Sequence, residues 1–170
     1  MKARVMIRLL EKGDIQKMAE AFYKFDWNKS VSLYERYYRE QMDNIRAIYV
    51  AFVEDQFAGY LTICWTSSYE PFEEENIPEI VDFNVLPNYR RRGIGTQLMD
   101  KAESEIAKVS SIAGIGVGMD SDYGPAQRLY ALRGYIPDGR GLHYKSHYPA
   151  YGEQITVDDS LALYLTKELK

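Results

Sequence analysis

The chain has 170 residues, of which 46% are hydrophobic and 27% charged, and its formal net charge is -4. This composition is typical of a folded, soluble protein, it excludes a disordered chain, and the length fits a single domain over residues 1–170. No apolar run approaches the roughly 18 residues that a membrane helix needs, so we expect no membrane partner. The acidic balance argues against nucleic acid as the main partner. The single cysteine, Cys64, cannot form an internal disulfide, which favours a cytoplasmic location.

Apolar patterning predicts the secondary structure along the chain. Continuous or alternating apolar runs indicate strands at residues 5–10, 45–55, 56–67, 79–86, 111–119 and 161–169. Apolar residues at helical spacing indicate helices at residues 15–25, 31–42, 96–106 and 123–135. Asp14 and Ser30 precede the first two helices and can cap them, since each side chain can accept a hydrogen bond from a free helix N–H. Residues 67–78 are polar and are expected to form a loop.

The order of these elements is strand, two helices, three strands, helix, strand, helix and at least one further strand. This order is typical of a mixed α/β sheet in one domain. The strand at residues 111–119 has one face that consists of Gly114, Gly116 and Gly118. A glycine face allows close approach by a ligand or another backbone, or the packing of a helix on a flat strand, and the sequence leaves both open.

A basic loop with two glycines lies between the strand at residues 79–86 and the next helix. Residues 90–92 are all arginine, and Gly93 and Gly95 follow them closely. A helix start leaves backbone N–H groups unpaired and carries a partial positive charge, and arginine side chains match phosphate oxygens in geometry and charge. The stretch therefore predicts a pyrophosphate site, with a solvated basic turn as the alternative.

Two common phosphate motifs do not fit this stretch. A P-loop requires a lysine followed by serine or threonine after its last glycine, whereas Thr96 and Gln97 follow Gly95 here. A dinucleotide-binding fingerprint requires a third glycine, but Leu98 stands at that position. The predicted phosphate site is therefore of another type.

Two segments resemble a known family. The pattern Arg90-x-x-Gly93-x-Gly95, after NVLP and before TQLMDKAE, resembles the acetyl-CoA-binding motif of the GNAT superfamily of N-acetyltransferases. The segment AQRLYALRGYIPDGRG, residues 126–141, is similar to the helix-then-GY segment that these enzymes carry downstream. The joint occurrence of both segments is much more specific than either one. Motifs carry the resemblance over residues 77–141, and element order alone carries it over residues 1–68.

The resemblance implies one N-acetyltransferase domain of the α/β class, with a central, mostly antiparallel mixed sheet and helices on both faces. The sheet would splay between residues 79–86 and 111–119, and acetyl-CoA would bind in the gap as co-substrate, without a metal. Pantetheine would lie along the backbone of residues 83–85, and the pyrophosphate would bind the amides of residues 91–96. The implied cofactor-binding residues are Phe83, Asn84, Val85, Arg90, Arg91, Arg92, Gly93, Ile94, Gly95, Thr96 and Tyr123. Many family members carry Asn where Tyr123 stands, so that loop departs from the family pattern.

Acetyl transfer to an amine calls for a base, because an amine of pKa about 10.4 is neutral in only roughly one of a few thousand molecules at pH 7. Glu79 is the candidate base, and the resemblance implies that it acts through water. In an unbroken strand Glu79 shares a face with Phe83 and Val85. Asp82, the rival base, lies on the opposite face unless a bulge intervenes. Either carboxylate could instead be an ordinary surface group.

Tyr130 is the candidate acid. The resemblance implies that a tyrosine at this position points to the thioester sulfur, and a phenol of pKa near 10 can donate a hydrogen bond to a leaving thiolate. The alternative is an ordinary half-buried core tyrosine. The predicted reaction is direct transfer of acetyl from acetyl-CoA to a primary amine of a small molecule or a protein, in a ternary complex.

Two other functions are alternatives to this one. A non-catalytic acyl-CoA-binding sensor on the same fold is the main alternative. Nucleic-acid binding through residues 90–92 would be weak and salt-sensitive, because no wider basic surface supports it. His143 and His147 are four residues apart, but no cysteine or carboxylate cluster joins them, so no metal site is expected. A homodimer is compatible with the resemblance.

Overall fold

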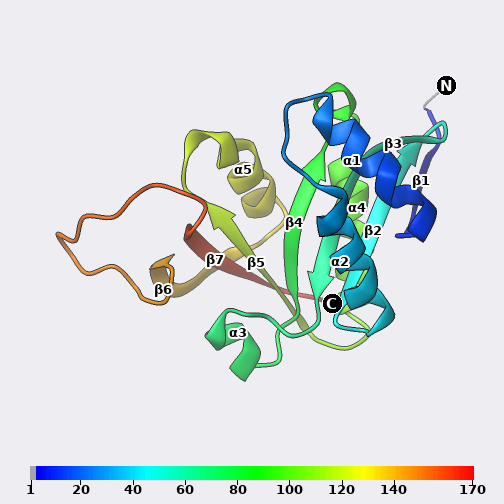
Figure 1. Cartoon of the computed structure of the whole chain (residues 1–170). Coiled ribbons are helices and arrows are strands. Elements are labelled where there is room, and N and C mark those ends of the chain that lie inside the picture. Colours follow the sequence, from blue (N-terminus) through cyan, green and yellow to red (C-terminus); the bar gives the residue numbers. More distant parts are fainter. Residues whose placement is uncertain (1–2) are drawn as a thin grey trace.

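The computed structural model describes residues 3–170 and contains a seven-stranded sheet with the strand order β1-β2-β3-β4-β5-β7-β6 (Figure 1). Neighbouring strands are antiparallel except β4 and β5, which run parallel. The prediction of a mixed, mostly antiparallel sheet is therefore confirmed. The strands are β1 Val5–Leu9, β2 Arg46–Val53, β3 Gln56–Cys64, β4 Glu79–Val85, β5 Ile112–Gly118, β6 Ile136–Tyr144 and β7 Leu161–Glu168.

Helices cover both faces of the sheet, as predicted. The α-helices are α1 Ile15–Tyr23, α2 Val31–Met42, α3 Glu70–Glu74, α4 Ile94–Ile106 and α5 Gly124–Leu132. Three short 3-10 helices lie at Lys12–Asp14, Pro87–Tyr89 and Ser121–Tyr123. In Figure 1, α1 and α2 lie on one side of β2 and β3, and α4 lies on the other. No helix within residues 3–170 is both long enough and apolar enough to cross a membrane.

The alternation of side chains along β2 explains the two layers of the core. Ile48 and Val50 point to one face and pack with α1 and α2, around the fully buried Phe22. Tyr49 and Ala51 point to the other face and pack with the apolar stripe of α4. The sheet is therefore covered on both faces, which matches the almost continuous apolar sequence of β2 and β3.

Three local predictions can be compared with the structure. Ser30 caps α2, because its hydroxyl accepts a hydrogen bond from the N–H of Leu33 at 3.2 Å. The cap assigned to Asp14 is wrong: its buried carboxylate binds the guanidinium of Arg8 at 2.7 and 2.9 Å, and it makes no capping bond to α1. The polar loop at residues 67–78 contains the short helix α3, because the buried ring of Phe72 anchors it.

The sheet opens between β4 and β5. Only two residue pairs join these strands, Glu79 with Gly114 and Ile80 with Ile115. Beyond Ile80 the strands diverge toward their C-terminal ends, as Figure 1 shows. This confirms the predicted splay and leaves one edge of β4 without a partner strand.

Candidate active site

A groove of about 1380 Å³ occupies the opening between β4 and β5. Its walls come from both strands, the start of α4, the segment around Tyr123, and α5. The groove brings together twelve of the thirteen site residues expected from sequence, namely Glu79, Phe83, Asn84, Val85, Arg90, Arg91, Gly93, Ile94, Gly95, Thr96, Tyr123 and Tyr130. The remaining one, Arg92, does not line it.

The start of α4 provides free backbone donors at the open end of the groove. The helix begins at Ile94, two residues earlier than expected, because Gly93 adopts the left-handed conformation with φ of 77° and ends the preceding loop. The amide of Gln97 bonds back to the carbonyl of Gly93 at 3.1 Å. The amides of residues 94–96 therefore have no partner within the helix. At Gly95 an added Cβ would lie 3.1 Å from the Phe83 ring, so the missing side chain lets β4 approach α4 closely.

The three arginines before this helix take different positions. Arg90 donates from Nε to the carbonyl of Val85 at 3.1 Å, and its guanidinium lies 5.5 Å from the centre of the Trp27 ring. Arg91 lines the groove. The guanidinium of Arg92 lies over the Tyr89 ring at 5.5 Å, outside the groove lining, so its predicted side-chain role is not supported.

Aromatic rings cover the glycine face of β5. An added Cβ at Gly114 would lie 2.4 Å from the Phe72 ring, and one at Gly118 would lie 2.4 Å from the Tyr123 ring. Gly116 lies against Tyr164 of β7. Neither expectation for this face is fully met, because the glycines make room for rings from three separate segments. Two of these rings, Tyr123 and Tyr164, line the groove.

Glu79 is buried at the closed end of the groove, with 8% of its surface exposed. Its carboxylate accepts a short hydrogen bond from the hydroxyl of Ser67, and Ser67 accepts one from the amide of Tyr69 at 3.0 Å. Burial raises the pKa of Glu79, while the Ser67 hydrogen bond opposes this rise. Ser67 is not among the expected site residues, because nothing in the sequence of a polar loop indicates that it folds back onto the sheet.

A bulge in β4 changes which side chains share a face. Val81 pairs with Thr62 and Asn84 pairs with Tyr60, so two residues of β4 oppose one residue of β3. Asp82 sits in the bulge with φ of 56°. Phe83 and Val85 are expected on the face of Glu79 only in an unbroken strand; because of the bulge, both pack toward α4.

The carboxylate of Asp82 instead turns toward α2, where four side chains donate hydrogen bonds to it. These donors are Lys29 at 2.7 Å, Tyr37 at 2.9 Å, Tyr60 at 2.5 Å and Asn84 at 2.8 Å. Burial alone would raise the pKa of Asp82, but Lys29 and the two phenols outweigh it, and the pKa is lowered. Asp82 is thus a stable anion whose oxygens are already engaged.

Tyr130 lies on α5 with 5% of its surface exposed, and it lines the groove beside Leu129 and Ala126. Burial raises its pKa, and the nearby Tyr123 adds to this rise. Its hydroxyl therefore stays protonated at neutral pH and is a hydrogen-bond donor. The same groove holds Glu79, so the structure brings the candidate acid and base together.

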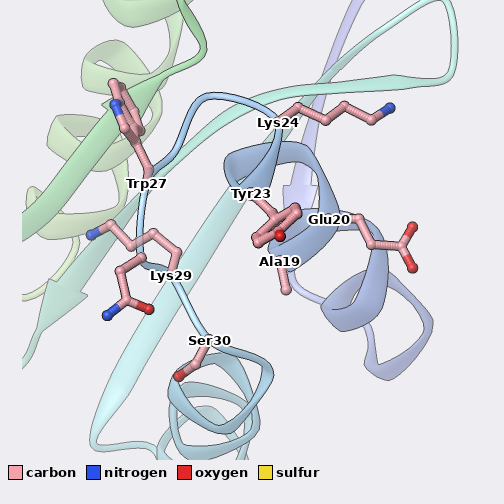
Figure 2. Close-up of a pocket in the computed structure, with 8 residues that line it drawn as sticks. Ala19, Glu20, Tyr23, Lys24, Trp27, Lys29 and Ser30 are labelled. Atoms are coloured by element: carbon pink, nitrogen blue, oxygen red, sulfur yellow. The ribbon is translucent and has the colours of Figure 1, made fainter.

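A second, smaller pocket of about 490 Å³ lies between the C-terminal end of α1 and the segment that leads to α2 (Figure 2). It is lined by Ala19, Glu20, Tyr23, Lys24, Trp27, Asn28, Lys29 and Ser30. Trp27 and Lys29 also line the large groove. Residues 24–30 therefore form a wall that separates the two pockets.

The sequence of this chain matches the profile of a known protein family. The profile of the Acetyltransferase (GNAT) family matches residues 13–135. The chain belongs to this family. The family is one of acyltransferase enzymes that use acetyl-CoA, so the resemblance seen in the sequence is confirmed.

Individual GNAT relatives are distant. An uncharacterized N-acetyltransferase of Archaeoglobus fulgidus is 34% identical over 85 residues, which cover 49% of this chain and only 56% of that protein. The N-acetyltransferase of Staphylococcus aureus Mu50 shares the fold, with a TM-score of 0.71, 18% identity, and 99% and 100% of the two chains covered. The yncA protein of Salmonella typhimurium, solved with its cofactor acetyl-CoA, has a TM-score of 0.68 at 16% identity, with 98% and 94% covered. At these identities the two structures show the fold alone.

The groove of this GNAT protein fits acetyl-CoA in two respects. The edge of β4 beyond Ile80 lacks a partner strand, which suits the amides of pantetheine. The amides of residues 94–96 and the adjacent Arg90 and Arg91 suit a pyrophosphate. Within residues 3–170 no group of three or more potential metal ligands is found.

Proposed function

We propose that the protein transfers an acetyl group from acetyl-CoA to a primary amine of a small molecule or a protein, with residues 1–170 as one catalytic domain. Direct transfer would take place in a ternary complex, with Glu79 as a base through water and Tyr130 as the acid. One observation carries the proposal: Glu79 and Tyr130 line the same groove as the free edge of β4 and the start of α4. The single cysteine, Cys64, favours a reducing compartment such as the cytoplasm.

Binding of the co-substrate would use the backbone more than side chains. The N–H and C=O groups of residues 83–85 offer hydrogen bonds along the open edge of β4. The amides of residues 91–96 would bind the pyrophosphate, and the side chains of Arg90 and Arg91 would add charge. Tyr123 would close the far wall against pantetheine.

Glu79 suits the role of base better than Asp82 does. Restricting reaction to the neutral fraction of a lysine-like amine costs about 4 to 5 kcal/mol at pH 7. A buried carboxylate with a raised pKa takes up a proton more readily than an exposed one, and Glu79 has this property. The lowered pKa of Asp82 and its four donors make it a poor proton acceptor.

Tyr130 would stabilise the leaving thiolate of CoA. The phenol is protonated at neutral pH because burial raises its pKa. It can therefore donate a hydrogen bond to the sulfur as the thioester bond breaks. The C–N bond of the amide would form as the C–S bond of the thioester breaks, CoA would leave as a thiol with a proton from Tyr130, and the amine proton would pass through a water to Glu79.

Release of free thiol from acetyl-CoA, measured with a panel of primary amines, tests this proposal. We expect amine-dependent thiol release by the wild-type chain, and mass spectrometry of the product should show one added acetyl group. CoA binding by calorimetry without thiol release for any amine would instead support a non-catalytic acyl-CoA sensor. Absence of CoA binding would contradict both functions.

A further inference from the structure

We infer that the ion pair between Lys29 and Asp82 is a positioning device, which holds residues 24–30 against the bulge of β4 and so fixes the two walls between which an amine would meet the thioester. This inference rests on the proposed function. Lys29 and Asp82 would act through the backbone and through Trp27, and neither would touch the reacting atoms.

The pair is close and partly shielded. Nζ of Lys29 lies 2.7 Å from Oδ1 of Asp82, and the exposed fractions of the two side chains are 24% and 16%. Asn84 donates to the same oxygen at 2.8 Å. Tyr37 of α2 and Tyr60 of β3 donate to the other oxygen. One carboxylate thus joins the segment before α2, α2 itself, β3 and β4.

The bulge is the part of β4 that this carboxylate holds. Asp82 has φ of 56°, a conformation that residues other than glycine adopt at a cost in free energy. The four hydrogen bonds to its side chain offset that cost. Because of the bulge, Phe83 turns toward α4, where its ring would lie 3.1 Å from a Cβ added at Gly95. The backbone proposed to bind pantetheine therefore has a geometry that depends on Asp82.

Residues 24–30 have a second contact, with the part of the groove that is proposed to bind the pyrophosphate. The Trp27 ring lies below the guanidinium of Arg90, at 5.5 Å, and stacks on Phe22 at 5.4 Å between ring centres. Figure 2 shows Trp27 and Lys29 extending on the same side of the segment, whereas Lys24 and Glu20 extend away from them. Trp27 and Lys29 both line the groove. The same two side chains connect residues 24–30 to Arg90 and to Asp82 of β4.

A second lysine–carboxylate ion pair in the chain provides a control that distinguishes positioning of the groove from stabilisation of the fold. Lys167 and Glu103 are 2.9 Å apart, and their exposed fractions of 23% and 13% match those of Lys29 and Asp82. Glu103 also accepts a hydrogen bond from a tyrosine, as Asp82 does. Neither Lys167 nor Glu103 lines the groove. Glu103 differs in one respect, because Arg133 also binds it at 2.9 Å. Lys167 therefore serves as a control for the loss of a lysine–carboxylate pair outside the groove.

The test compares Lys29→Met with Lys167→Met in the full chain, with an amine that the wild type acetylates. We expect a loss of Tm in both variants, with the larger loss in Lys29→Met, because Glu103 keeps Arg133 as a partner. We expect kcat to fall about tenfold or more in Lys29→Met only, with the Kd for CoA changed less than threefold, because misplacement of positioned groups lowers the rate of transfer more than binding. Lys29→Arg, which keeps the charge, should recover part of kcat.

Equal kcat in Lys29→Met, Lys167→Met and the wild type would overturn the inference and leave a structural ion pair. Should Lys29→Met not fold, Lys29→Gln replaces it, because its amide removes the charge and can still donate a hydrogen bond to Asp82. A wild-type kcat in Lys29→Gln would then overturn the inference. A wild type that acetylates no amine would contradict the proposed function itself, and the inference that rests on it would fall with it.

Discussion

Ile80 and Ile115 form the last residue pair that joins β4 to β5, and beyond them the two strands separate. Glu79 lies one position before this pair, at the closed end of the groove, and Val85 lies five residues beyond it, next to the loop that leads to α4. The unpaired edge of β4, residues 81–85, is roughly 15 Å long at the usual rise of a strand. The proposed base and the helix start proposed to bind phosphate thus lie at opposite ends of one open strand edge.

Glu79→Gln should lower kcat/KM for the amine by about 10² at neutral pH, because the carboxylate proposed to accept the amine proton is lost. The loss should be smaller at pH 9, where more of the amine is already neutral. Thiol release measured between pH 6.5 and pH 9 gives the profile. An unchanged pH profile would remove Glu79 from the base role.

Tyr130→Phe should lower kcat by about 10² with little change in the KM for acetyl-CoA, since the lost hydroxyl would act on the leaving sulfur. Tyr135→Phe is the matched control: it is a buried tyrosine, 3% exposed, whose hydroxyl bonds to Glu103 rather than facing the groove. The control should lose some stability and keep its kcat. Equal kcat values for the two variants would argue that Tyr130 is a core residue only.

Arg90→Ala should raise the KM for acetyl-CoA by about tenfold, because a charge-assisted contact to phosphate would be lost. Arg92→Ala should change it by less than about twofold, because Arg92 lies over Tyr89 outside the groove lining. Both substitutions remove one positive charge, so their difference isolates the position of the charge. The same KM for both variants would mean that only the net charge matters.

Asp82→Asn should reduce the free energy of unfolding at pH 7 and lose this effect in acid. The folded-state pKa of Asp82 is lowered, so its ionised form stabilises the native state above the unfolded pKa of about 3.9. This contribution disappears as the pH falls through the folded-state pKa. Urea unfolding at pH 7 and pH 3 should therefore show a smaller difference from wild type at the lower pH. A difference independent of pH would show that the charge of Asp82 does not stabilise the fold.

Gly114→Ala should destabilise the protein by about 1 to 3 kcal/mol, as overpacking of a core does. The new Cβ would lie 2.4 Å from Phe72, whose ring is held by Tyr69 and Tyr164 at 4.9 and 5.5 Å. Gly13→Ala is the control, because no atom lies within 4 Å of the added Cβ. Thermal unfolding of both variants measures the effect, and equal Tm values would show that the Phe72 ring can move aside.

The proposed co-substrate half of the site could be predicted from sequence because it is local. Gly93 ends the loop and starts α4, and the free amides follow from any helix start. Neighbouring residues such as Arg90 and Arg91 then lie near those amides whatever the rest of the chain does. The position of Arg92 could not be predicted, since contact with Tyr89 depends on side-chain packing.

The sequence by itself determined the order of the elements and a helix start with free amides after the arginines, because these follow from periodicity and from backbone chemistry within a few residues. Only the tertiary structure decided which carboxylate stays a bound anion and which is buried near the closed end of the groove. The bulge turns Asp82 toward Lys29, and the contact of Ser67 with Glu79 spans twelve positions of the chain. Contacts between residues far apart in sequence depend on the packing of the whole chain, and no short segment encodes them.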